Sequence, residues 1–209
     1  MKLLAIGAHP DDIEFGCGGT LLKFSRDGEN EINLLVMTRG DKGGDPDVRK
    51  GEQERSAGIM KARTVFWGGY SDTQVPHSSE TIQKVEGIVK EIKPDLIFIL
   101  WPDDVHQDHH NIAHAAVTAT RYSRNVLFYE VPTTQNFQPN VFVDIGDVLE
   151  EKFRILEAHA SQVFATRIAD LSILESAKSS ATFRGYQGRV KYAEGFMSLR
   201  LSLLYHEGR

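Results

Sequence analysis

The chain has 209 residues, of which 41% are hydrophobic and 25% are charged, and its formal net charge is −5. These values are typical of one globular domain with a core of its own. The negative charge and the lack of a Lys/Arg-rich run argue against a nucleic-acid-binding surface. No apolar stretch is as long as a membrane span, and the apolar run at the N-terminus is too short for a signal peptide. We therefore expect a cytoplasmic protein.

The single cysteine, Cys17, excludes a disulfide within the chain. Its place near the start of an expected helix would lower the pKa of its thiol. No base and no second cysteine accompany it, so we do not expect a catalytic thiol.

Strand and helix patterns alternate along most of the chain. Nearly continuous apolar runs, typical of strands covered on both faces, occur at residues 2–7, 32–38, 64–67, 95–100, 125–131 and 140–146. Helical patterns occur at 17–27, 49–62, 79–92, 110–122 and 147–161. This alternation predicts an α/β fold: a Rossmann-like, doubly wound, mainly parallel sheet with helices on both faces, in a single domain over residues 1–209.

The last part of the chain is less regular. We expect extra helices there and a loop-rich lid at residues 180–196. Within that lid, Phe183 and Tyr186 are expected to pack rather than to bind a ligand.

The first expected strand is followed directly by His9, Pro10, Asp11 and Asp12. Adjacent carboxylates at the mouth of a buried strand are costly unless a positive group neutralises them. One interpretation is a turn with a helix cap, where aspartate is common. A dinucleotide site fits badly, because the glycines come too late and the carboxylates would repel a pyrophosphate.

A metal site removes the difficulty. His9 and Asp12 lie three residues apart in a tight turn and can face one divalent cation. Their nitrogen and oxygen ligands suit zinc, and also iron or cobalt. Asp11 then lies beside the ion, where a free carboxylate can act as general base.

The rest of such a site is expected in HQDHHNIAH, residues 106–114, which follows the strand expected at 95–100. In the common doubly wound order the first and fourth strands are neighbours, so the two loops meet. Asp108, between His106 and His109, can orient a histidine. His114 is expected to pack on a helix face or to be solvated.

Four segments carry a resemblance to a known family. They are AHPDD at 8–12, HQDH at 106–109, TRGDKGG with RKGEQERSAGIM within 38–60, and GRVKYAEGF at 188–196. Together they resemble the LmbE-like, or PIG-L, family of zinc-dependent N-acetylglucosamine deacetylases. The last segment resembles the bacterial subgroup that deacetylates N-acetylglucosaminyl-malate in bacillithiol biosynthesis.

The resemblance implies that His9, Asp12 and His109 hold Zn²⁺, with Fe²⁺ or Co²⁺ as alternatives. His110 directly follows the last of these, where many relatives have another residue. The choice of His109 over His110 therefore rests on alignment of the motif.

The resemblance also implies the catalytic residues. Asp11 is the general base, and His106 stabilises the tetrahedral oxyanion or protonates the leaving amine. Asp108 tunes a neighbouring histidine, and Tyr192 matches a mobile tyrosine that reaches the oxyanion. Either Asp11 or His106 protonates the amine.

Weaker candidates surround this set. Arg49, Glu52 and Arg55 begin a helical pattern, and a solvated helix start is as plausible there as substrate binding. Arg39 and Asp41 lie in a glycine-rich segment that is expected to edge the pocket and to contact a sugar hydroxyl.

The expected function is metal-dependent hydrolysis of the N-acetyl group of an N-acetylglucosamine conjugate, with N-acetylglucosaminyl-malate as the first choice. The alternatives are a hydrolase of another N-acyl or amide compound, and a metal- or sugar-binding module without turnover. Asp11 argues against the module, since a binding site needs no spare carboxylate beside the ion. We expect a small amino-sugar substrate, no nucleic-acid or membrane partner and, by analogy, a homo-oligomer.

Overall fold

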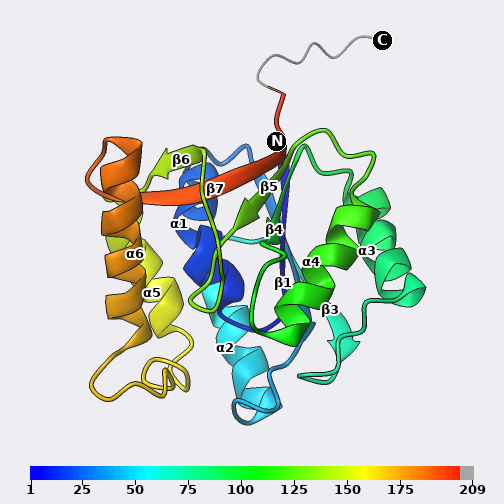
Figure 1. Ribbon diagram of the computed structural model, residues 1–209, viewed down its shortest axis with the longest axis horizontal. Coiled ribbons are helices and arrows are strands. Elements are labelled where there is room, and N and C mark those ends of the chain that lie inside the picture. Colours follow the sequence, from blue (N-terminus) through cyan, green and yellow to red (C-terminus); the bar gives the residue numbers. More distant parts are fainter. Residues whose placement is uncertain (203–209) are drawn as a thin grey trace.

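A twisted sheet forms the centre of the structure, a computed structural model that describes residues 1–202 (Figure 1). Within that range seven strands lie in the order β3-β2-β1-β4-β5-β7-β6. Their bounds are β1 (Lys2–Gly7), β2 (Glu31–Thr38), β3 (Thr64–Tyr70), β4 (Leu96–Leu100), β5 (Val126–Tyr129), β6 (Val141–Asp144) and β7 (Ala193–Arg200). Strands β1 to β5 pair in parallel, whereas β7 is antiparallel to both β5 and β6. The predicted Rossmann-like, mainly parallel α/β domain is confirmed; residues 203–209 of the expected range lie outside the described part.

Helices cover both faces of the sheet, as predicted. They are α1 (Asp12–Arg26), α2 (Pro46–Ile59), α3 (Ser79–Ile92), α4 (Gln107–Ala119), α5 (Leu149–Glu157) and α6 (Ile173–Gly188), with a 3₁₀ turn at Gly146–Val148. Helices α3 and α4 pack together, while α5 packs against α1 and α2 (Figure 1).

The strand order places two loops side by side. β1 lies between β2 and β4, with Ile6 beside Leu35 on one side and Ile99 on the other. The chain therefore winds outward in opposite directions from β1, and the loops that follow β1 and β4 leave the same edge of the sheet. Ligands bind at this point in open α/β sheets, because the loops diverge there and leave a crevice.

Two local predictions are wrong. The first helix begins at Asp12 rather than at residue 17. The lid expected at 180–196 is instead the end of α6 and the start of β7. A capping box between Ser172 and Glu175 begins α6, and β7 is held by strand pairing on both of its sides.

The exposure of two aromatic residues also differs from expectation. Phe183 is 58% exposed and Tyr186 is 75% exposed, so the prediction that they pack is wrong. Both lie on α6, whose buried residues are Ala177, Ala181, Arg184 and Gly185.

The glycines of α1 serve close packing. A Cβ atom on Gly16 would lie 2.0 Å from the ring of Tyr129, so no larger residue fits there unless β5 moves. Cys17 beside it is fully buried, and burial raises the pKa of its thiol well above the ordinary value. The expected lowering of that pKa is therefore wrong.

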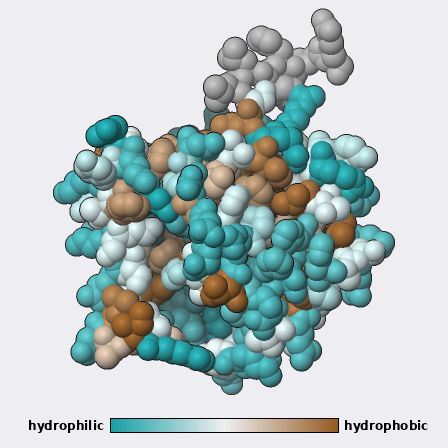
Figure 2. Space-filling model, in the orientation of Figure 1, coloured by the Kyte–Doolittle hydropathy of each residue, from teal (hydrophilic) through white to brown (hydrophobic). Residues whose placement is uncertain are grey.

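The view in Figure 2 shows a mainly hydrophilic face, on which apolar residues form separate patches. Among residues 1–202, the structure contains no helix with the length and apolar character needed to cross a bilayer.

Candidate active site

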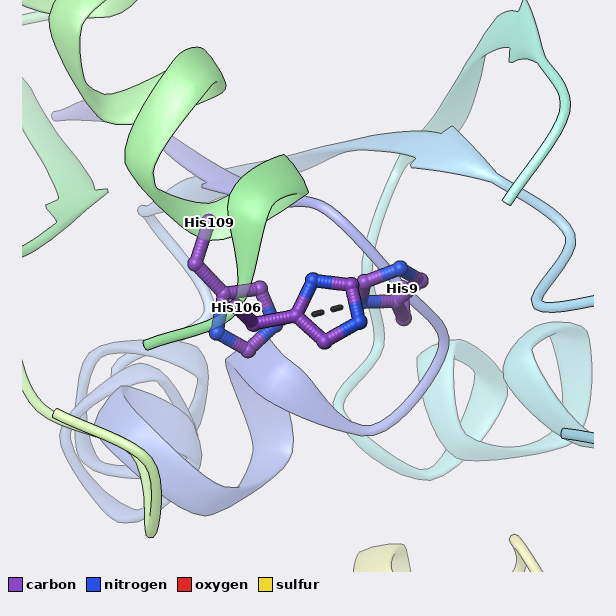
Figure 3. Close-up of side chains that lie close together, drawn as sticks. All are labelled: His9, His106 and His109. Carbon is purple, nitrogen blue, oxygen red and sulfur yellow. Dashed lines mark hydrogen bonds between the residues drawn. The ribbon is translucent and has the colours of Figure 1, made fainter. Parts of the chain in front are cut away.

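Three histidine side chains meet at the carboxyl edge of the sheet (Figure 3). His9 comes from the loop after β1, and His106 and His109 come from the beginning of α4. The ring of His106 stacks on that of His109 with centroids 4.7 Å apart, and its edge meets His9 at 4.6 Å. The structure thus brings together the two histidine motifs that the sequence predicted to meet.

The three predicted metal ligands converge within this group. His9 Nδ1 lies 3.1 Å from His109 Nε2, and His109 Nε2 lies 3.3 Å from Asp12 Oδ1. His9 Nδ1 lies 3.7 Å from Asp12 Oδ2. Ligand atoms on a tetrahedral zinc are about 3.3 to 3.5 Å apart, given bonds of about 2.0 to 2.1 Å. His9, Asp12 and His109 therefore fit one transition-metal ion.

The outer nitrogen of His9 is fixed by two carboxylates. His9 Nε2 lies 2.9 Å from Asp72 Oδ1 and 3.2 Å from Asp108 Oδ2. Asp108 is in turn held by the backbone N–H groups of Thr73 and Val75, at 2.6 and 3.1 Å. Since a carboxylate only accepts, Nε2 carries a proton, and in the neutral ring Nδ1 is then free to bind a metal.

The outer nitrogen of His109 is fixed in the same way. His109 Nδ1 lies 3.2 Å from Asp104 Oδ1 and 3.3 Å from the hydroxyl of Thr133. Asp104 also accepts hydrogen bonds from the backbone N–H of His106 and from Thr134. In the neutral ring, this arrangement leaves His109 Nε2 without a proton and directed at His9.

Negative charge exceeds positive charge at this centre. The carboxylates of Asp12, Asp72, Asp104 and Asp108 surround the imidazoles of His9 and His109. Burial opposes protonation of His9, but its hydrogen bonds to carboxylates outweigh burial and raise its pKa well above the ordinary value. Asp12 and Asp104 likewise overcome burial and raise the pKa of His109 to about 9. Two protonated rings would repel each other across 3.1 Å, whereas one divalent cation between the two nitrogens would neutralise the surrounding carboxylates without that repulsion.

Asp11 has a separate environment. Its backbone has φ 98°, an uncommon conformation for a residue with a side chain, and its carboxylate makes no capping hydrogen bond to α1. The carboxylate lies 3.3 Å from Arg49 Nη2 instead. Burial and the neighbouring Asp12 raise the pKa of Asp11 to about 6, against the opposing effect of Arg49. Asp11 therefore occupies the N-cap position of α1 without capping it through its side chain, and its carboxylate pairs with Arg49 instead.

The backbone of α4 fixes one ring nitrogen of His106. It is the N-cap residue of α4, and its Nδ1 accepts the backbone N–H of Asp108 at 3.2 Å. In the neutral ring the proton then lies on Nε2. Partial burial and the two neighbouring histidines lower the pKa of His106, which favours that neutral form.

The first turn of α2 is exposed, but Arg49 and Glu52 behind it are buried. Arg49 is 4% exposed and donates to the carbonyl oxygens of Gly40 and Pro10, at 2.9 and 2.8 Å. A Cβ atom on Gly40, which has φ +67°, would collide with this guanidinium. Glu52 is also buried and accepts two hydrogen bonds from Ser161, whereas Arg55 is exposed. Arg49 thus links Asp11 to the glycine-rich loop.

Three residues singled out in the sequence lie outside this centre. Tyr192 is partly buried against the core, and its ring lies near Lys191. Its backbone carbonyl accepts the N–H of Ile145, and its catalytic role stays a prediction. His110 bonds the carbonyl of Pro102 and contacts His114, so it faces away from His9.

Sequence reasoning missed three residues that orient the histidines: Asp72, Asp104 and Thr133. Each follows a strand at the carboxyl edge, after β3, β4 and β5 respectively. A signal was present for Asp104 in the segment WPDDV, but carboxylates in such loops are also common turn residues.

Comparisons with known proteins agree with this geometry. Residues 4–120 match the family model described as "PIG-L: GlcNAc-PI de-N-acetylase". The uncharacterized deacetylase YaiS of Escherichia coli is 33% identical over 168 residues, which cover 76% of this chain and 90% of YaiS. The probable N-acetyl-alpha-D-glucosaminyl L-malate deacetylase 2 of Bacillus cereus is 26% identical, with coverage of 88% and 94%. The structure of N,N'-diacetylchitobiose deacetylase from Pyrococcus horikoshii superposes with a TM-score of 0.81 at 29% identity, covering 95% of this chain and 83% of that one.

Proposed function

Because the chain belongs to the PIG-L family of de-N-acetylases, we propose that it hydrolyses the N-acetyl group of an N-acetylglucosamine conjugate and releases acetate and a free amine. One observation carries this proposal. Two imidazole nitrogens and a carboxylate converge within 3.1 to 3.7 Å, while Asp11 lies beside them and makes no helix cap. A purely structural metal site is closed by its ligands and needs no such neighbour.

We propose zinc as the metal, held by His9 Nδ1, the Asp12 carboxylate and His109 Nε2. Three protein ligands of nitrogen and oxygen type are the usual set at a catalytic zinc. When bound, zinc polarises the acetyl carbonyl and lowers the pKa of water at the site towards about 7. Asp72, Asp108 and Asp104 hold the two histidines in their ligating tautomers.

Asp11 is the proposed general base. It takes a proton from the attacking water. Arg49 holds its carboxylate in place by an ion pair, which leaves the carboxylate able to accept that proton. Its raised pKa, about 6, still leaves it ionised at neutral pH.

His106 Nε2–H is the proposed donor to the oxygen of the tetrahedral intermediate. One such donor contributes on the order of 3 kcal/mol to lowering the barrier. The leaving amine needs a proton, and both His106 and the newly protonated Asp11 carry one. Tyr192 remains a candidate for a second donor to the oxyanion, provided that the segment before β7 moves.

The remainder of the substrate has a suitable place beside the metal site. A cavity of about 300 Å³ is lined by Arg39, Asp41, Trp67, Tyr70 and their neighbours. Its Asp41 accepts the backbone N–H of Asp72, so the cavity adjoins the carboxylate that orients His9. Aromatic rings with a few polar groups are a typical lining for a small polar ligand. We propose that the group attached to the deacetylated sugar binds here.

N-acetylglucosaminyl-malate is the first substrate to test, because Arg39 at the cavity can exchange its exposed partner Asp47, at 3.1 Å, for the carboxylates of malate. N,N'-diacetylchitobiose is the second, because Trp67 and Tyr70 offer ring faces to a second sugar. Acetate release should be measured for both compounds and for N-acetylglucosamine, with zinc-loaded protein and with chelator-treated protein. Equal release by the two preparations would contradict the metal mechanism. Release only from unrelated N-acyl amides would favour the alternative hydrolase, and no release with full metal binding would favour a binding module.

We propose further that the protein acts in the cytoplasm as a homo-oligomer. Support for a second copy comes from the α5–α6 loop, where Phe164 is 79% exposed and Ile168 is 61% exposed. An apolar patch covers this region in Figure 2. Light scattering of the purified protein tests the oligomer.

A further inference from the structure

A second histidine cluster lies on the outer surface of α4. His110 and His114 are four residues apart on this helix and therefore lie on one face, with ring centroids 4.5 Å apart. His77, from the loop between β3 and α3, brings a third ring to 5.7 Å from His114. The proposed deacetylation uses none of these three residues.

The spacing of these rings resembles that of the first cluster. The pair proposed to hold the catalytic metal, His9 and His109, has centroids 5.2 Å apart, which lies between the two distances of the second cluster. Two imidazoles on one metal with bonds of about 2.0 Å have centroids about 4.5 to 5.5 Å apart. The His110–His114 pair lies at the lower end of this range, whereas His77, at 5.7 Å from His114, lies just outside it. The nitrogen atoms of these three rings do not lie within 4.8 Å of one another, as those of His9, His106 and His109 do, so a shared ion requires the exposed rings of His77 and His110 to rotate.

The protonation of the cluster favours a cation. His110 Nδ1 lies 3.0 Å from the carbonyl oxygen of Pro102, which can only accept, so Nδ1 carries the proton and Nε2 keeps its lone pair. A second nitrogen bonded to a backbone carbonyl is usual for histidines that bind metals. Partial burial and the neighbouring rings of His110 and His77 lower the pKa of His114, which keeps it neutral and able to bind.

We propose that His77, His110 and His114 form a second site for a divalent transition metal, separate from the catalytic centre. Imidazole ligands select zinc, nickel and copper over calcium and magnesium, which prefer oxygen. Without a carboxylate ligand or a buried position, this site binds zinc more weakly than the catalytic centre does.

The site has a structural consequence, because it joins two segments that orient the catalytic histidines. The loop that carries His77 also carries Asp72 and the two N–H groups that hold Asp108. Helix α4 is already bonded to this loop by Asn111, whose side chain donates to the carbonyl of Val75 at 2.9 Å. A metal at the second site adds a further link between loop and helix, and so slows local opening of residues 71–78.

Calorimetric titration of tag-free, metal-free protein with zinc tests the site. We expect two equivalents per chain, the second weaker. The His77→Ala/His114→Ala variant should keep the first equivalent and lose the second. A Gln83→Ala/Thr118→Ala control, which changes exposed side chains on α3 and α4, should keep both. The second site should also bind copper more tightly than nickel or zinc, and should not bind magnesium.

Hydrogen exchange tests the link. With the second equivalent bound, amides of residues 71–78 should exchange more slowly in the wild type and at an unchanged rate in the double variant. One equivalent in the wild type, or two in the His77→Ala/His114→Ala variant, would overturn the site. A second equivalent without slower exchange would overturn the link between loop and helix.

Discussion

The Asp11→Asn substitution tests whether the two adjacent aspartates, Asp11 and Asp12, have different functions. The amide has the same size, and its oxygen can still accept from Arg49, which lies 3.3 Å from the native carboxylate. Asn cannot accept the proton of the attacking water. The proposed ligand Asp12 should keep its position, because its Oδ2 is held by the N–H groups of Ala8 and His9 at 2.9 and 2.8 Å.

The expected loss of turnover follows from the role of the base. A positioned general base contributes about 10²- to 10⁴-fold, so the barrier should rise by about 3 to 5 kcal/mol. Stability should change in the opposite direction. The pKa of Asp11 is raised from an ordinary 3.8 to about 6, so the ionised carboxylate destabilises the metal-free fold by up to about 3 kcal/mol. This penalty is present above the raised pKa and disappears as the pH falls towards the ordinary value.

Three measurements make the test complete: zinc content, kcat for acetate release, and the free energy of unfolding in chelator at several pH values. The Asp11→Asn variant should bind one zinc in the catalytic centre, turn over at most about a hundredth as fast, and unfold less readily than the wild type at about pH 7.5. An Asp12→Asn control should lose the zinc itself. Turnover near the wild-type rate, or loss of zinc from the Asp11→Asn variant, would refute the assignment of Asp11 as base.

Three other predictions concern groups around the site and in the core. Asp72→Asn should weaken zinc binding about 10- to 100-fold in a competition with a chelator, because His9 loses a carboxylate partner; unchanged affinity would speak against that role. Lys152→Met should cost about 3 to 5 kcal/mol in denaturant unfolding, because it leaves the buried Glu194 carboxylate without its cation, and a cost below about 1 kcal/mol would contradict this. Burial lowers the pKa of His159, but the Glu14 carboxylate has the larger effect and raises it. The stability that protonated His159 contributes is therefore full below about pH 6.5 and is lost as the pH rises through the raised pKa. The lowered pKa of Glu14 makes its contribution present above about 4.5 and lost in acid. The Tm difference between wild type and Glu14→Gln should therefore be largest near about pH 5 to 6, and a difference independent of pH would exclude the pair.

The convergence of the two histidine motifs could be predicted because each motif is local in sequence and follows a strongly apolar strand. His9 and Asp12 follow β1, and His109 follows β4, so the doubly wound order was sufficient to bring them together. The orienting residues Asp72 and Asp104 were not predicted. Their roles depend on the paths of loops, and those paths are set by contacts such as the hydrogen bond from the Asp72 N–H to Asp41.

The helix start and the lid show the same limit. Glycines at 16, 18 and 19 have low helix propensity, so the start of the first helix was predicted too far along the chain. Close packing against Tyr129 requires glycine at 16 and overrides that propensity. The segment GRVKYAEGF has no strand pattern of its own, and β7 forms because β5 and β6 supply partners on both sides.

The left-handed backbone of Asp11 explains how neighbouring carboxylates can have different roles. Residues next to each other at a helix start would ordinarily compete for the same N–H groups. With φ 98°, Asp11 turns its carboxylate to Arg49, while Asp12 enters α1 and faces His109. Such a conformation costs on the order of 1 to 3 kcal/mol and persists because the surrounding bonds to Asp12 and Arg49 fix both sides of it. In the proposed mechanism, the strain at Asp11 therefore keeps the proposed base from binding the metal, since a metal-bound carboxylate would lose its capacity to accept a proton.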